Sequence, residues 1–136
     1  MNALAIENEP AQPGLLRRAL QADFLVTGSA GVLLTLAAGP LGDLFDLPVA
    51  LLRMTGFGLL PYTAFVVYVA TRTEIPRRGA WAIVALNLVW AVASLVLLVS
   101  GWVDPSGIGM AFVVAQALIV VGFADIQYLG LRRSNG

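Results

Sequence analysis

The sequence predicts an all-α polytopic membrane protein, an antiparallel bundle of four transmembrane helices. Of its 136 residues, 59% are hydrophobic and only 12% are charged, whereas a typical soluble domain is roughly half apolar and about a quarter charged. The apolar residues gather into four segments, each longer than the roughly 20 residues that cross a hydrocarbon core. The connections between these segments are short, so consecutive helices are expected to be antiparallel neighbours.

The four predicted spans cover residues 15–39, 49–71, 79–103 and 107–131, within a single transmembrane domain of residues 15–133. The third span carries no charge and begins and ends near Trp81 and Trp102. Along a helix these tryptophans would lie about 31 Å apart, which matches the two interfaces of a bilayer core about 30 Å thick.

The ends of the chain are predicted to be short cytoplasmic tails, residues 1–14 and 134–136. The first fourteen residues are acidic and contain prolines, which is a poor start for a signal peptide. Between the first two spans, residues 40–48 alternate apolar side chains with Asp43 and Asp46. This pattern predicts a short interfacial helix, and a plain extracellular loop is the alternative.

The arginines predict the orientation of the bundle, because the sequence contains no lysine. Seven of the eight arginines lie before the first span, between the second and third spans, or after the fourth. Positive charge stays on the cytoplasmic side of a membrane. We therefore expect a protein of the bacterial inner membrane with both termini in the cytoplasm.

Several classes of function are disfavoured by the residues that are missing. Without histidine or cysteine there can be no disulfide, histidine-ligated haem or zinc, or serine–histidine relay. The absence of lysine removes Schiff-base chemistry. We therefore expect no enzyme activity, no cofactor and no metal site, and without a basic surface no nucleic-acid partner.

Two acidic residues inside the spans are the candidate proton or ion-pair site. Asp23 follows Arg18 by five positions, and Asp125 precedes Arg132 by seven, so both lie at a similar depth from the predicted cytoplasmic side. Each shares a helix face with small residues, which mark packing faces in membrane bundles; on the fourth span these are Gly107, Ala111, Ala115 and Gly122. If the two carboxylates met, at least one would hold a proton. The alternative is an interfacial salt bridge that fixes the helix ends.

Four other residues in the spans are candidates for specific contacts. Asn87, near the middle of the third span, and Arg53, near the extracellular end of the second, are predicted interhelical polar contacts, Arg53 by reaching an acidic loop residue. Pro61 frees a carbonyl in the second span and is a candidate hinge. Gln116 lies about 180° around its helix from Asp125. We therefore expect it to contact a second protein chain rather than leave an amide in lipid.

The layout resembles the small four-helix inner-membrane proteins of bacteria, including the DoxX-like group. The similarity covers all four spans and rests on the arginines ahead of the first helix, the exit "AAGPLGD" and the closing "QYLGLRR". It implies the four-helix fold and transfers no catalytic or ligand motif.

Two functions follow from these observations. The first is an accessory, structural or regulatory membrane subunit, surrounded by the lipid bilayer and packed against another membrane protein or a copy of itself. The alternative is a small proton-linked transporter or carrier that uses Asp23 and Asp125.

Overall fold

The computed structural model describes the backbone of residues 3–135 and the side chains of residues 14–132. In this part of the chain all regular structure is helical, and the order of elements is α1 (Ala3–Leu36), α2 (Ala38–Phe45), α3 (Val49–Ala70), α4 (Arg77–Ser100) and α5 (Gly107–Asn135). The predicted all-α class is therefore confirmed. Four segments are long and apolar enough to cross a membrane: Gly14–Leu36, Val49–Ala70, Arg77–Ser100 and Gly107–Arg132.

The helix bounds differ from the predicted spans mainly in α1. This helix begins at Ala3, so the predicted tail is helical from that residue onward, and it ends at Leu36, three residues before the predicted end. One residue later the chain enters α2, so the segment that could have been a plain loop is a short helix. Asp46 closes α2 in the left-handed conformation, with φ 58°, which aspartate tolerates better than most residues.

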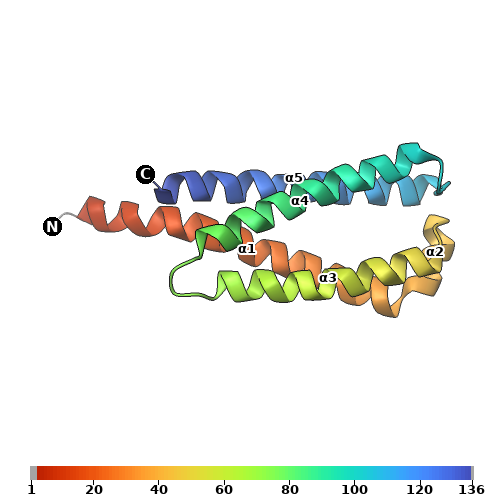
Figure 1. Cartoon of the computed structure of the whole chain (residues 1–136), viewed down its shortest axis with the longest axis horizontal. Coiled ribbons are helices and arrows are strands. Elements are labelled where there is room, and N and C mark those ends of the chain that lie inside the picture. Colours follow the sequence, from red (N-terminus) through yellow and green to blue (C-terminus); the bar gives the residue numbers. More distant parts are fainter. Residues whose placement is uncertain (1–2, 136) are drawn as a thin grey trace.

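The long helices form two pairs that are joined through α1 and α5 (Figure 1). Helix α1 packs along α3, and α4 packs along α5. Helices α3 and α4 follow each other in sequence, yet they barely touch. Both ends of the described chain lie at the end of the bundle that holds the α3–α4 connection, and α2 and the α4–α5 connection lie at the opposite end (Figure 1).

Small residues set a close contact between α1 and α3. A Cβ atom added at Gly56 would lie 2.5 Å from the Thr35 hydroxyl oxygen and 2.9 Å from the carbonyl oxygen of Gly31. Only glycine permits this approach of the two backbones, which is the usual packing device between helices in lipid.

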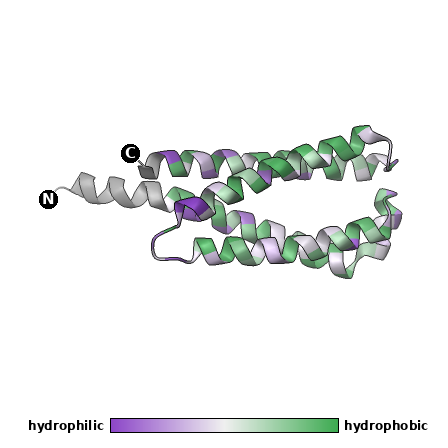
Figure 2. Cartoon of the chain, viewed as in Figure 1, coloured by the Kyte–Doolittle hydropathy of each residue, from purple (hydrophilic) through white to green (hydrophobic). Residues whose placement is uncertain are grey.

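The long helices are apolar along most of their described length (Figure 2), and many of their apolar side chains are exposed. Large side chains such as Leu36, Val99 and Trp102 are 79%, 83% and 87% exposed. Large apolar side chains are exposed on all four long helices. Monomeric soluble proteins rarely expose so many, and lipid is the solvent that suits them. Together with the four long apolar helices, it defines a membrane protein.

Candidate functional site: a buried polar cluster and an adjoining cavity

Five polar side chains meet inside the bundle, and we call them the polar cluster. Asp23 and Thr27 come from α1, Tyr62 from α3, Asn87 from α4 and Gln127 from α5. One carboxylate oxygen, Asp23 Oδ2, lies 2.9 Å from the Tyr62 hydroxyl, 3.0 Å from Asn87 Nδ2 and 2.8 Å from Gln127 Nε2. The other, Oδ1, accepts a hydrogen bond from the Thr27 hydroxyl at 2.9 Å. All four long helices therefore converge on one carboxyl group.

The cluster holds this carboxyl group without a cation. Asp23 and Gln127 are fully buried and Asn87 is 4% exposed. In the part of the chain with described side chains, no arginine contacts Asp23, whose partners are all uncharged. A buried carboxylate is normally paired or saturated with hydrogen bonds, and here only hydrogen bonds are present.

Tyr62 has two possible acceptors for its single hydroxyl hydrogen. Its oxygen lies 2.9 Å from Asp23 Oδ2 and 3.0 Å from Asn87 Oδ1, and a phenol can donate only one hydrogen bond at a time. Asn87 Nδ2 also donates to Gln127 Oε1 at 3.1 Å. The cluster is thus a connected network in which one hydroxyl hydrogen can change partner without movement of a heavy atom.

Residue spacing along the helices accounts for the inward position of three members of the cluster. Asp23 and Thr27 are four residues apart and so share one face of α1. Asn87 follows the buried Ala80 by seven positions and precedes the buried Ala91 by four, which continues the small-residue face of α4. Asn87 is therefore the interhelical polar contact that the sequence predicted.

The structure does not bring Asp23 and Asp125 together, although the sequence left open that the two carboxylates could meet. Asp125 is exposed and makes no hydrogen bond or ion pair with any residue whose side chain the structure describes. The small residues Ala111 and Ala115, chosen as the inner face of α5, are exposed too. Buried positions on this helix are Gly109, Val113, Ala117, Ala124, Gln127, Gly130 and Leu131. Helix α5 therefore turns a different face inward, and this face also carries small residues, namely Gly109, Ala117, Ala124 and Gly130. Because α5 is apolar on all sides, its sequence pattern does not distinguish the two faces.

Gln116 does not face outward, which corrects the expectation of a contact with a second chain. Its Oε1 accepts a hydrogen bond from Trp90 Nε1 at 2.8 Å, and its Nε2 donates to the carbonyl of Val113 at 2.8 Å. Both polar ends of the side chain are thus used within this chain. The reason for placing it against a partner, an amide left in lipid, no longer applies.

Arg53 and Pro61 are both exposed. Arg53 makes no hydrogen bond or ion pair with the described side chains, so the predicted interhelical contact of this arginine is absent. Its position near the start of α3 lets the guanidinium reach the membrane surface instead. Pro61 lies inside the unbroken helix α3, and its role as a hinge stays a prediction.

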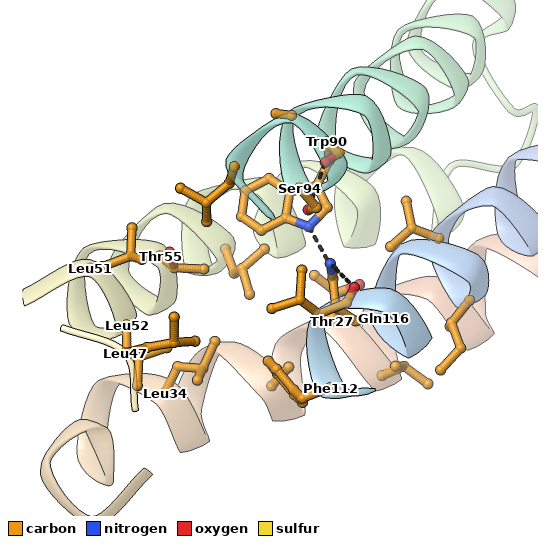
Figure 3. Close-up of a pocket in the computed structure, with 18 of the residues that line it drawn as sticks. Thr27, Leu34, Leu47, Leu51, Leu52, Thr55, Trp90, Ser94, Phe112 and Gln116 are labelled. Carbon is orange, nitrogen blue, oxygen red and sulfur yellow. Dashed lines mark hydrogen bonds between the residues drawn. The ribbon is translucent and has the colours of Figure 1, made fainter. Parts of the chain in front are cut away.

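Two adjoining cavities lie beside the polar cluster. The main cavity, about 350 Å³, is lined by side chains from α1, α3, α4 and α5 (Figure 3). The seam cavity, about 530 Å³, lies between α3 and α4, where these helices fail to pack. Thr27, Leu59, Trp90, Ala93 and Val120 line both. Volumes of this size are within the range of small-molecule sites, about 300–1,000 Å³.

The polar cluster forms part of the cavity walls. Thr27 lines both cavities, and Tyr62 and Asn87 line the seam cavity. Asp23 itself lies behind these side chains and is fully buried. A molecule in the cavities would therefore touch the partners of the carboxyl group and not the group itself.

Sequence reasoning missed Tyr62 and Gln127. The signal that could have found Gln127 was its spacing from Gln116, since eleven residues correspond to about three helical turns and place both amides on one face of α5. Nothing in the sequence marked Tyr62, because a tyrosine in a transmembrane segment is equally suited to an interface.

Comparisons of the chain with protein-family models, with curated proteins and with solved structures found no match. The resemblance to the DoxX-like group therefore stays a prediction. Among the residues with described side chains, no group of three or more acidic side chains that could hold a metal ion occurs.

Proposed function

We propose that the protein is a small proton-linked carrier of the bacterial inner membrane, with both termini in the cytoplasm. In this proposal Asp23 binds the proton and the adjoining cavities hold a small amphipathic molecule. The observation that carries it is the carboxyl group of Asp23, buried without a cation and hydrogen-bonded by all four long helices. Ionisable groups within membrane bundles commonly serve as proton relays and ion sites.

The geometry of the cluster suits both protonation states of Asp23. In the ionised state, Oδ2 accepts hydrogen bonds from Tyr62, Asn87 and Gln127. In the protonated state, Oδ2–H donates to the Tyr62 oxygen and still accepts from Gln127, while the Tyr62 hydrogen turns to Asn87 Oδ1, 3.0 Å away. The Asn87 amide keeps Gln127 Oε1 as its acceptor. Every buried donor keeps an acceptor in both states, so neither state incurs the cost of an orphaned polar group.

Protonation can be linked to occupancy of the cavities through the walls that they share with the cluster. The only titratable side chain that faces Asp23 within the described part of the chain is Tyr62, since α4 and α5 present the amides of Asn87 and Gln127. A molecule in the seam cavity would contact Tyr62 and Asn87, the two residues whose hydrogen bonding changes with the proton. Binding that favours one arrangement of these groups must also favour one protonation state.

The first test is infrared spectroscopy of the protein in liposomes across a pH titration, with Asp23→Asn as the variant. An asparagine can place its oxygen at the Oδ2 position and its NH₂ toward the Thr27 hydroxyl, so the variant should fold. Because the chain has eight acidic residues, we expect the difference between the wild-type and Asp23→Asn spectra to contain one carboxylic-acid band that grows as the pH falls. Asp125→Asn is the matched control and should keep the band.

The second test measures linkage between the proton and the cavity. The affinity for 1-pyrenemethanol, a neutral amphipathic fluorophore, is measured from pH 5 to 9. One linked proton changes affinity by at most about tenfold per pH unit. We expect a pH-dependent affinity in the wild type and in Asp125→Asn, and a constant affinity in Asp23→Asn. Binding that is independent of pH in the wild type would refute proton linkage.

An accessory subunit is the second candidate, favoured by the open seam between α3 and α4, which the transmembrane helix of a partner could cover. Purification in mild detergent tests this candidate. A stoichiometric membrane partner, or a defined oligomer lost when Ala93 in the seam is replaced by tryptophan, would support it. A monomer without a partner would oppose it.

A further inference from the structure

The main cavity has walls with almost no free polar group. No charged residue lines it. Of its polar side chains, Thr27 donates to Asp23, Ser94 donates to the carbonyl of Trp90, and Gln116 uses both ends within the chain. These groups are satisfied in the absence of a ligand, so they do not require one.

Thr55 is the exception. Of the four half-buried threonines with described side chains, Thr35 and Thr63 each donate to a carbonyl one turn earlier, and Thr27 donates to Asp23. The Thr55 hydroxyl makes no hydrogen bond with any residue that the structure describes, and the residue lines the main cavity. In Figure 3 it lies on α3, across the cavity from the Trp90–Gln116 pair.

We infer that the main cavity binds a neutral, largely apolar molecule with one hydroxyl or carbonyl group, and that Thr55 orients it through a hydrogen bond. This inference rests on the proposed function, because it specifies what the carrier binds. The apolar walls, among them the rings of Trp90, Phe112 and Phe123, fit a flat or ring-containing body. The one unpaired hydroxyl fits one polar group.

A charged ligand does not fit the same walls. A cation would need the carboxylate of Asp23, but that group is fully buried and already accepts four hydrogen bonds. An anion would need a basic side chain, and none lines either cavity. Moving an unpaired charge into such a space is strongly unfavourable. The seam cavity adjoins the gap between α3 and α4, which gives an apolar molecule a lateral route from the bilayer.

Three fluorophores with the same pyrene ring system test the ligand class. Pyrene has no polar group, 1-pyrenemethanol adds a hydroxyl, and 1-pyrenemethylamine adds a cationic amine. Binding is read as energy transfer from Trp90 to pyrene in the full chain carrying Trp81→Phe and Trp102→Phe. Ala93→Phe, which places a ring at a position that lines both cavities, supplies the background from probe dissolved in detergent.

Thr55→Val removes the hydroxyl at constant shape, Thr55→Ser keeps it, and Thr63→Val is the matched control on the same helix outside the main cavity. We expect 1-pyrenemethanol to bind about three- to tenfold more tightly than pyrene, and this advantage to vanish in Thr55→Val alone, as expected for one hydrogen bond.

Equal affinity of pyrene and 1-pyrenemethanol, or an unchanged preference in Thr55→Val, would overturn the role of Thr55. If 1-pyrenemethylamine bound more tightly than 1-pyrenemethanol, the ligand would not be of the neutral class. If energy transfer from Trp90 were no greater than in Ala93→Phe, the main cavity would not be the binding site. Failure of the proposed function would give a different result. In that case 1-pyrenemethanol would bind through Thr55, but its affinity would not change with pH.

Discussion

Gln127→Met tests whether the polar cluster stabilises the bundle. Gln127 is fully buried, donates to Asp23 at 2.8 Å and accepts from Asn87 at 3.1 Å. Methionine has nearly the same shape but replaces neither bond. The variant therefore removes one of four hydrogen bonds to the Asp23 carboxylate and leaves one amide hydrogen of Asn87 without its acceptor.

Two scales bound the expected loss of unfolding free energy. Values from soluble proteins are about 1.5–3 kcal/mol for a hydrogen bond to a charged group and about 1–3 kcal/mol for a buried group left unsatisfied. Interhelical hydrogen bonds in membranes average about 0.6 kcal/mol and reach about 1.7 kcal/mol, because the unfolded helices find other partners in the bilayer. For two bonds to a fully buried cluster, we expect a loss of about 2–4 kcal/mol.

The assay is reversible unfolding in mixed micelles, followed by circular dichroism as the denaturing detergent increases. Asp125→Asn, two residues earlier on the same helix and exposed, is the control and should stay within about 0.5 kcal/mol of wild type. In a double-mutant cycle with Asp23→Asn, we expect a coupling of about 1 kcal/mol or more. If Gln127→Met matched the control, or the two variants proved additive, the cluster would not be the energetic centre of the bundle.

Three further predictions concern the packing and the ends of the helices. Gly56→Ala should lower the free energy of unfolding by about 1–3 kcal/mol, because its Cβ would lie 2.5 Å from the Thr35 hydroxyl oxygen of α1. Gly58→Ala is the control, because a Cβ there would have nothing within 4 Å. It should be neutral or stabilising by up to about 1 kcal/mol in the same unfolding assay. Arg17 donates to three carbonyls at the end of α3 and just beyond it, so Arg17→Gln should destabilise by about 1–2 kcal/mol, whereas equal loss in the exposed Arg18→Gln would refute a specific cap. Pro61→Ala should reduce the pH dependence of 1-pyrenemethanol binding if the proline is a hinge, and an unchanged pH profile would show that it only shapes α3.

Asp23 and Asp125 show that the sequence did not predict which face of each helix is buried. Both are single carboxylates in apolar helices, at similar depth and beside small residues. One is fully buried at the centre of a network and the other is exposed. In water the apolar face of a helix identifies its buried side, but in lipid both faces are apolar, so the pattern of hydrophobicity does not fix the rotation of a helix.

The sequence by itself determined the class of protein, the number of membrane helices and their approximate bounds. These follow from the length of apolar runs and the short connections between them, which are properties of single segments and depend on bilayer thickness alone. It also identified Asn87 as an interhelical contact, because an amide in the middle of an uncharged span has few other hydrogen-bond partners.

The tertiary structure alone decided the rotation of α5, the pairing of α1 with α3 and of α4 with α5, and the open seam between α3 and α4. Tyr62, Gln127 and Thr55 gained their roles from that arrangement. Their partners are up to 104 positions away in the sequence, as for Asp23 and Gln127. Which side chains meet across such distances depends on how whole helices pack, and no local pattern encodes it.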